Sequence, residues 1–273
     1  MAVCVHRVQT WRSPKRARWN LYQHPNRLVR WYFWRRLEVA LGLSSPVRRG
    51  VALDIGCGEG FFLPSLAGEF ELTLGLDINE KVVDEEAYDP SVLGKHVLDL
   101  TRGLVVTECG AEASVSILAG DALALPLSDN TVDVVFCLDA IEHMPDPRRL
   151  LGEVYRVLKP EGRFIATMPV EKGMPLLLRQ VNAWALNVAR ERYTVRDLLA
   201  AVFGRVEPGR VSCTLTHKGY DYWADLKLIE TLFTITSVRY IPFHGLGWLS
   251  PTVGVLAIKE ACKPGIKGAN CAL

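Results

Sequence analysis

The ten residues "VALDIGCGEG", from Val51 to Gly60, decide the fold of this chain. The apolar run 50–55 has the length of a buried strand, and glycines follow it at positions 56, 58 and 60. The stretch 59–70 then predicts a helix with Pro64 in its first turn. Strand, glycine loop and helix in this order begin a doubly wound parallel sheet, in which ligands bind beyond the carboxyl ends of the strands.

The same alternation of strands and helices continues along the chain. Apolar runs predict further strands at 72–77, 114–122, 131–140 and 162–170. Apolar residues at helical spacing predict helices over 27–43, 146–162 and 220–233. In the second of these, Asp146 is the expected N-cap, and Pro160 with Gly162 is expected to end the helix. The stretch 79–112 gives no clear assignment.

Two departures from the alternation matter for function. Between residues 171 and 216 the alternation of strands and helices is interrupted by an insertion. Two helices are expected in it, one after Pro175 and one from Thr194 to Gly204. Near the end, the strand-like runs 235–243 and 252–261 are joined by a loop rich in Gly and Pro, with no helix between them. Without a crossover helix, these two strands should pair antiparallel.

Composition narrows the class of protein. A chain of 273 residues can bury a large core, as one large α/β domain with insertions or as two small domains. Its seven cysteines are scattered, with no C-x-x-C pair and no Cys/His cluster at zinc spacing, so we expect reduced thiols and no metal site. Because no run is long and apolar enough to span a membrane, and no signal peptide is evident, a cytoplasmic location is expected.

Charge is distributed unevenly. Residues 1–50 contain eleven Lys and Arg against one acid, Glu38, so they carry +10 although the whole chain carries only +2. Four tryptophans lie in the same segment. Two readings remain open: contact with an anionic partner, either a membrane surface or RNA, or a solvated arm and helix whose arginine stems lie along the protein surface.

Three acids at strand ends indicate the kind of ligand. The glycines follow G-x-G-x-G rather than the dinucleotide pattern G-x-G-x-x-G, and Asp54 precedes them. A carboxylate there would repel a pyrophosphate and attract an ammonium group, which favours a ligand carrying an amine and a carboxylate. Asp77 is placed to accept hydrogen bonds from ribose hydroxyls, and Asp121 from an adenine amine. Taken singly, each acid could equally be a strand-end cap or a surface charge.

The segments "VALDIGCGEG", "LGLDIN" and "GDALALPLSDNTVDVVFCLDAIEHMPDPRRLLGEVYRVLKPEGRFI", with the final helix-free strand pair, resemble the class I S-adenosylmethionine-dependent methyltransferases. The resemblance is to the type 11 group, which includes the ubiquinone and menaquinone methyltransferases, and covers roughly 48–170 and 217–260. It implies a doubly wound α/β fold with a seven-stranded sheet in the order 3-2-1-4-5-7-6, strand 7 antiparallel, and helices on both faces. We therefore expect a basic aromatic arm and helix (1–47), a methyltransferase domain (48–262) with a helical lid (171–216), and a flexible tail (263–273).

The resemblance also assigns residues to S-adenosylmethionine, the implied cofactor. Those near its methionine part are Asp54, Gly56 and Gly58, with Cys57 as a small filler between the glycines. Those near its ribose and adenine are Asp77, Ile78, Asp121 and Ala122. From the end of the fourth strand, Leu138 and Asp139 are also expected to contact it.

Catalysis and the acceptor are less determined by the sequence. Methyl transfer from a sulfonium needs mainly alignment and exclusion of water, and a base only if the acceptor arrives protonated. His143 is the candidate base, and a packing or capping role is the alternative. The apolar insertion favours a small apolar acceptor such as a quinone precursor, isoprenoid or lipid. The alternatives are RNA modification through segment 1–50, nucleotide-dependent oxidoreduction, and a catalytically silent binding protein; the oligomeric state is left open.

Overall fold

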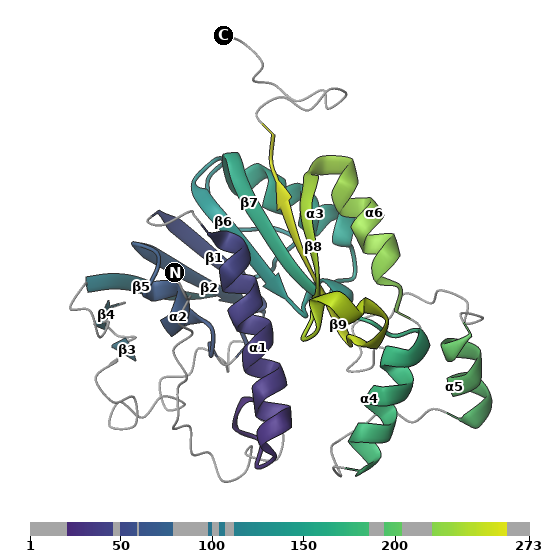
Figure 1. The fold of residues 1–273 in the computed structure, drawn as a ribbon. Coiled ribbons are helices and arrows are strands. Elements are labelled where there is room, and N and C mark those ends of the chain that lie inside the picture. Colours follow the sequence, from purple (N-terminus) through teal and green to yellow (C-terminus); the bar gives the residue numbers. More distant parts are fainter. Residues whose placement is uncertain are drawn as a thin grey trace.

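A computed structural model describes residues 21–45, 50–58, 60–78, 98–99, 104–106, 112–185, 194–203 and 220–260. Its centre is one mixed sheet with the strand order β3-β4-β5-β2-β1-β6-β7-β9-β8 (Figure 1). The strands are β1 (Val51–Ile55), β2 (Leu72–Asp77), β3 (Leu98–Asp99), β4 (Leu104–Val106), β5 (Glu112–Ala119), β6 (Val132–Leu138), β7 (Leu158–Pro169), β8 (Thr234–Ile241) and β9 (Thr252–Ile258).

The predicted topology is confirmed. The strands β5, β2, β1, β6 and β7 are parallel neighbours, and β9 pairs antiparallel with both β7 and β8. In chain order this core reads 3-2-1-4-5-7-6, with the last strand antiparallel. Two short strands, β3 and β4, extend the β5 edge antiparallel. They come from the stretch that the sequence left unassigned.

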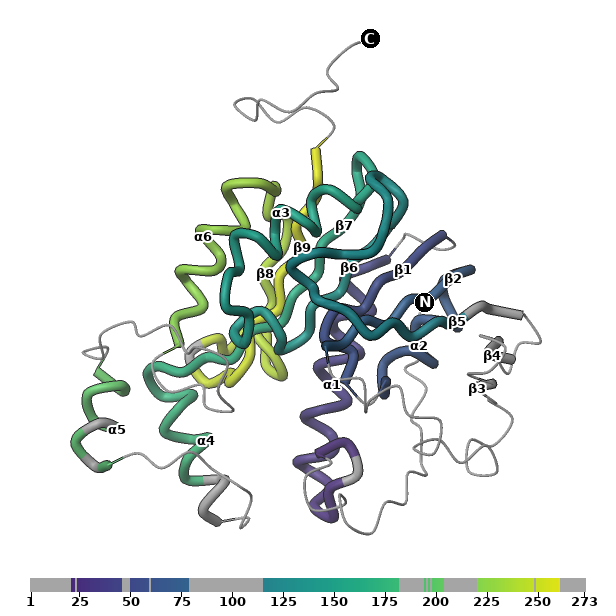
Figure 2. The backbone as a smooth tube through the Cα atoms, turned by 180° about the vertical axis from the view of Figure 1, so that it is seen from behind, coloured from purple at the N-terminus to yellow at the C-terminus, as the bar shows by residue number. Residues whose placement is uncertain are grey.

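Helices cover both faces of the sheet. They are α1 (Arg27–Ser44), α2 (Leu63–Ala67), α3 (Pro147–Val157), α4 (Gly173–Ala185), α5 (Val195–Val202) and α6 (Tyr222–Leu232), with short 3-10 turns η1 (Leu21–Gln23), η5 (Ile141–His143) and η6 (His244–Leu249). Figure 2, seen from behind, shows α3 and α6 in front of the sheet and α1 beyond it. No helix in the described ranges is long and apolar enough to cross a membrane.

The side chains of β6 point alternately to the two faces of the sheet and pack into two hydrophobic cores. Val134 and Phe136 pack into the layer under α1 and α2, with Trp34 and Leu37 of α1. Val135 and the next alternate residue, Cys137, pack into the opposite layer under α3 and α6. Because both faces are covered, nearly every residue of the strand is apolar and buried, which is why the central strands could be predicted from the sequence.

Two predicted helices differ from the structure. The helix expected over 59–70 is only the single short turn α2, ending before Gly68, and the residues before it belong to the glycine loop. The helix expected to run to Pro160 ends at Val157, and β7 begins at Leu158. Proline disfavours helical backbone in the residue before it, and it cannot donate the hydrogen bond that a continued helix needs. Asp146 is the N-cap, as predicted, and accepts from the Arg149 N–H at 3.1 Å.

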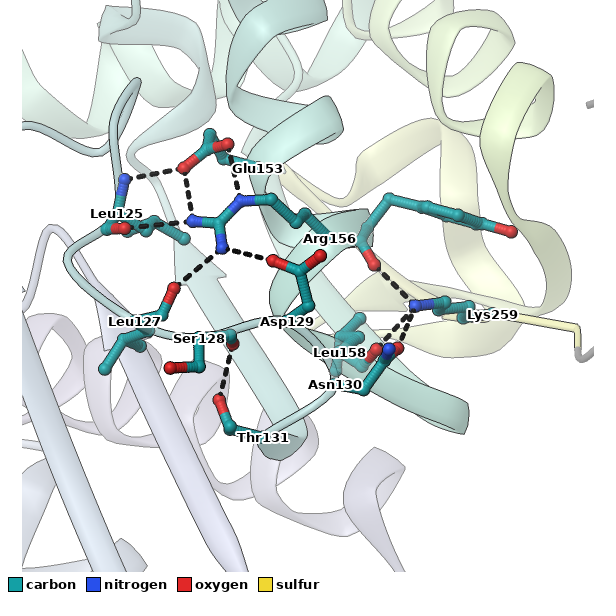
Figure 3. A network of polar contacts seen from close by, with 11 residues as sticks. Leu125, Leu127, Ser128, Asp129, Asn130, Thr131, Glu153, Arg156, Leu158 and Lys259 are labelled. Atoms are coloured by element: carbon teal, nitrogen blue, oxygen red, sulfur yellow. Dashed lines mark hydrogen bonds and ion pairs between the residues drawn. The ribbon is translucent and has the colours of Figure 1, made fainter. Parts of the chain in front are cut away.

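A network of two cations joins the loop after β5 to α3 and β9 (Figure 3). The Arg156 guanidinium donates to both Glu153 oxygens, at 2.8 and 2.9 Å, and to the backbone oxygens of Leu125 and Leu127. Buried Lys259 donates from Nζ to three oxygens, among them the Leu158 carbonyl at 2.6 Å. These contacts fix the start of β7 and the end of β9 against α3.

The insertion and the first half of α1 lie at the carboxyl end of the parallel strands. In both views α4 and α5 extend beyond this end of the sheet, as does the start of α1 (Figures 1 and 2). Two ion pairs hold α4 to the body. Buried Glu171 pairs with Arg179 of α4, and Lys172 pairs with Asp221, the N-cap of α6, at 2.8 Å. The tail 263–273 and the arm 1–20 lie outside the described residues.

Candidate functional site

The glycine loop has the backbone that only glycine adopts freely. Gly56, Gly58 and Gly60 have φ of 71°, 52° and 73°. A Cβ on Gly56 would lie 2.8 Å from the Cβ of Ala140, whereas a Cβ on Gly58 would meet nothing within 4 Å. Gly56 therefore permits close packing against the turn after β6. Gly58 faces open space in which a ligand can approach the backbone.

Asp77 connects the loop to the end of β2. Its Oδ2 accepts a hydrogen bond from the Gly58 N–H at 3.0 Å, and the backbone N–H of Gly56 donates to the Leu76 carbonyl at 2.7 Å. The structure thus brings together two predicted site residues 19 positions apart. Ile78, the next residue, is 78% exposed and presents an apolar side chain beside them.

Asp54 is a buried acid at the end of β1, with 3% of its surface exposed. Burial, reinforced by the neighbouring Asp77 carboxylate, raises the pKa of Asp54 to about 8. The protein does not offset the cost of a buried negative charge at this position, so a ligand cation next to the ionised carboxylate would be strongly favoured. A raised carboxyl pKa beside an open glycine loop is typical of a binding site.

Cys57 is half-buried between the glycines. Burial raises the pKa of its thiol, and the Asp54 and Asp77 carboxylates raise it further, so the thiolate needed for nucleophilic attack is disfavoured. Its sulfur lies where a Cβ on Gly75 would be only 3.0 Å away. These contacts agree with the interpretation of Cys57 as a small filler.

Asp121 and Ala122 follow the end of β5, on the far side of β2 from the glycine loop. Asp121 is exposed, and its Oδ1 accepts from the Leu123 N–H at 2.8 Å, which makes it the cap of its own turn. Ala122 is buried in the core beside Leu125. The capping contact is the role that the sequence left open as an alternative, and it does not occupy all the acceptor capacity of a carboxylate.

Leu138 and Asp139 end β6 on the other side of the loop. Asp139 has a φ of 50°, which is uncommon for a residue with a side chain. Its Oδ1 accepts from the Thr167 hydroxyl at 2.8 Å, and its backbone N–H donates to the Thr167 carbonyl at 3.0 Å. The end of β7 thereby holds Asp139 in place.

Arg36 is the site residue that sequence reasoning missed. It lies on α1, is 7% exposed, and forms an ion pair with Asp139. Its Nε has no hydrogen-bond partner in the described structure, and its guanidinium lies 4.7 Å from the centre of the Phe33 ring. Burial lowers the pKa of Arg36, but Asp139 together with Tyr22 and Tyr32 outweighs burial and raises that pKa above its usual range.

A signal for Arg36 was present in the helical phase of α1. The buried apolar positions Trp34, Leu37 and Leu41 define the inward face of the helix. Arg36 adjoins this face, whereas Arg35 points to solvent and pairs with Glu38. In the sequence "WRR" the two arginines look equivalent, and only their positions around the helix axis distinguish the buried one from the exposed one.

Aromatic side chains from the N-terminal part cover the site. Tyr22 stacks on Phe61 beside the glycine loop, with ring centroids 5.1 Å apart. The Tyr32 hydroxyl bonds to the Thr252 hydroxyl at the start of β9. Burial raises the pKa of both tyrosines, and Arg36 and Asp139 lie near enough to influence both pKa values. The basic segment therefore contributes to the site as well as to the surface.

His143 lies in η5, five residues after the end of β6, and is half-buried. Its backbone N–H donates to the Ala140 carbonyl at 3.1 Å. The neighbouring Glu142 is 3% exposed, and burial together with Asp139 raises the pKa of its carboxyl well above the usual range. The turn thus places an imidazole and a buried acid near Asp139. No group of His, Cys, Asp and Glu in the described ranges is arranged to hold a metal ion.

Comparison with known proteins finds similarity to methyltransferases. Residues 53–166 match the model described as a methyltransferase domain. A demethylmenaquinone methyltransferase from Lactobacillus johnsonii is 30% identical over 134 residues, 48% of this chain and 46% of that protein. A cycloartenol-C-24-methyltransferase 1 from Oryza sativa subsp. japonica is 34% identical over 130 residues, 46% of this chain and 33% of that protein. The chain spans less than half the length of these two relatives.

Solved structures show the same fold. The PH0226 protein from Pyrococcus horikoshii OT3 aligns with a TM-score of 0.54 at 19% identity, covering 90% of this chain and 96% of that chain. The family match covers Asp54, Asp77, Asp121 and Asp139, whereas the antiparallel strand pair β8–β9 lies outside it. Residues 53–166 therefore form a methyltransferase domain, and the chain is similar in sequence to the demethylmenaquinone and cycloartenol methyltransferases named above.

Proposed function

We propose that this protein transfers a methyl group from S-adenosylmethionine to a small-molecule acceptor with a substantial apolar part. The observation that carries the proposal is a charge pattern at the glycine loop. Asp54 on β1 is a buried acid, and Arg36 on α1 is a buried cation whose Nε has no partner in the described structure; both lie near enough to Tyr22 to influence its pKa. An amino acid group carries the complementary charges, an ammonium and a carboxylate.

These residues fit the methionine part of the cofactor. Asp54 would take the ammonium, which would offset the cost of ionising a buried carboxyl. Arg36 would donate from its free Nε to the carboxylate, in the geometry for which a guanidinium is well suited. Gly58 leaves the backbone accessible between them, because no side chain fills the space before it.

The nucleoside part would lie along the neighbouring strand ends. Asp77 would accept from ribose hydroxyls while keeping its bond to the Gly58 N–H. Ile78 would border the adenine, with Asp121 accepting from the adenine amine and Ala122 lining the base. Leu138 and Asp139 would contact the cofactor from the other side of the loop. Asp139 would also hold Arg36 in position through their ion pair.

The bound cofactor would supply an activated methyl group and its own leaving group. The protein's part is then to orient the acceptor and keep water away, which can account for a large share of the rate of a bimolecular reaction. Tyr22 and Phe61 would exclude water at the loop. His143 would hold a proton from an acceptor hydroxyl or amine, if the acceptor arrives protonated.

The acceptor side is formed by parts outside the family match. The helices α4 and α5, within the proposed lid 171–216, follow β7 at the end of the sheet where the cofactor residues lie. The two relatives described above are named for a quinone precursor and a sterol. Together with the apolar sequence of α4, these names support an acceptor that is largely hydrocarbon.

The experiment is to incubate the protein with methyl-labelled S-adenosylmethionine and a cell extract separated into lipid, small-metabolite, RNA and protein fractions. Label in the lipid or small-metabolite fraction is expected. The variant Gly56→Ala should transfer none, whereas the exposed control Lys227→Glu should match the wild type. Label only in RNA would overturn the acceptor proposed here and support RNA modification. No label in any fraction, despite measurable cofactor binding, would indicate a binding protein.

A further inference from the structure

Exposed apolar side chains are concentrated at one end of the molecule. The described residues contain ten large apolar side chains that are exposed, and all ten lie on segments at the carboxyl end of the parallel strands. Seven are on α1, α4, α5 and the loop that carries η6, and the other three are Phe203 after α5, Ile78 after β2 and Trp223 at the start of α6. Scattered exposed apolar residues need no explanation, but a concentration at one end does.

Six of these residues form what we call the apolar rim: Leu28 and Trp31 on α1, Phe243 and Leu246 at η6, and Met174 and Val181 on α4. The rim crosses from one element to the next through direct contacts. The rings of Trp31 and Phe243 have centroids 6.0 Å apart, which joins α1 to the η6 loop. The helix α4 packs against η6 and also against α5, and Leu199 on α5 and Phe203 directly after it are exposed as well.

The charge beside the rim is positive. Arg27 and Arg35 lie one turn before and one turn after Trp31 on the exposed side of α1, although Arg35 is paired with Glu38. In the sequence, residues 1–20 contain five Lys and Arg and no acid. A tryptophan and aliphatic residues flanked by arginines are the composition of a surface that lies in the interface of an anionic bilayer.

We infer that the apolar rim docks on an anionic lipid bilayer, so that the carboxyl end of the sheet faces the membrane. Trp31 and Phe243 would enter the headgroup region, while Arg27 would pair with lipid phosphates. The cofactor residues lie at the same end of the sheet. An acceptor dissolved in the bilayer would therefore reach them without crossing water.

Two other occupants fit the rim less well. RNA would use the aromatic rings for stacking, but four of the six rim side chains are aliphatic and offer nothing to a base. A second copy of the chain would bring the basic side of α1 against the same positive charge in a symmetric contact. A lipid surface satisfies both the aliphatic and the basic residues.

The test is co-sedimentation of the purified protein with phosphatidylcholine vesicles, with and without about one third phosphatidylglycerol. It is done without cofactor or acceptor, so its outcome does not depend on the proposed reaction. Binding to the anionic vesicles that weakens with salt is expected. The exposed pair of substitutions Trp31→Ser and Phe243→Ser should lower the partition coefficient at least about tenfold. Arg27→Glu should lower it about fivefold or more.

A control for charge is available on α6, where Lys227 is an exposed cation outside the apolar rim. Lys227→Glu should leave vesicle binding within about twofold. Circular dichroism would confirm that every variant is folded.

Three results would overturn the proposal. One is absence of vesicle binding at low salt. Another is binding that the double substitution leaves unchanged. The third is a double variant that differs from the wild type only in RNA binding or in oligomeric state, which would assign the rim to that partner instead.

Discussion

Replacing Asp54 by asparagine removes a buried carboxyl whose pKa rises from 3.8 to about 8 on folding. Between these two values the unfolded chain has released the proton and the folded protein retains it. The stability that this group contributes is fully present below about pH 4 and is lost as the pH rises towards 8. One proton corresponds to about 1.4 kcal/mol per pH unit.

Asparagine does not titrate, so the stability of the variant does not decrease in this way as the pH rises. The unfolding free energy of Asp54→Asn minus that of the wild type should therefore increase by about 3 kcal/mol from pH 5 to pH 7. Burial also raises the pKa of Glu142, but that group is present in both proteins and largely cancels in the difference. Urea unfolding at pH 5, 6 and 7, followed by tryptophan fluorescence, measures the difference directly.

The same carboxyl should release its proton when the cofactor binds, because the ligand ammonium favours the ionised form. Calorimetry at pH 7 in two buffers of different ionisation enthalpy should show release of close to one proton for the wild type and none from this position in the variant. The variant should also bind S-adenosylmethionine more weakly. A stability difference that does not change with pH, together with unchanged proton release, would refute the reasoning.

Four other perturbations test the site and its surroundings. Gly56→Ala should destabilise the fold by about 1–3 kcal/mol, because the residue has a positive φ and its new Cβ would meet Ala140. The control Gly42→Ala in α1, with free space around the new Cβ, should be neutral or slightly stabilising. Thermal unfolding compares the two variants. Asp77→Ala should lower cofactor affinity at least about a hundredfold with the fold retained, and unchanged affinity in calorimetry would mean that the ribose assignment is wrong. Arg36→Met should cost about 3–5 kcal/mol by leaving the Asp139 charge unpaired, and the double variant with Asp139→Asn should recover part of it in urea unfolding. Glu153→Gln should show the opposite pH dependence of unfolding free energy to Asp54→Asn. The hydrogen bond from Arg156 lowers the pKa of Glu153 in the folded protein. The wild type should therefore be more stable than Glu153→Gln near neutral pH and lose this difference as the pH falls.

The central sheet could be predicted because its strands are buried on both faces and so read as short apolar runs. The glycine loop was equally legible, since its acids and glycines fall within a few residues of one another. The antiparallel end of the sheet followed from a missing helix between two apolar runs. In each case a local pattern determined the structure.

The parts that were missed depend on contacts between distant segments. Arg36 becomes a site residue only when α1 packs against the end of β6, where Asp139 lies more than a hundred residues later. The raised pKa of Asp54 depends on its burial and on Asp77 in the neighbouring strand. The length of the helix α3 was overestimated because Leu158 already begins β7, where it pairs with Val132 of β6.

The antiparallel course of β9 has a consequence for how the acceptor side is built. A parallel last strand would need a crossover connection and would begin at the opposite end of the sheet. Because β9 turns back directly, the short loop between β8 and β9 stays where the parallel strands finish. It contacts α1 there through Phe243, while Thr252 at the start of β9 bonds to Tyr32. This one reversal of strand direction thus adds a separate loop beside the candidate site, and its length and composition can change without disturbing the strands that lead to Asp54, Asp77 and Asp139.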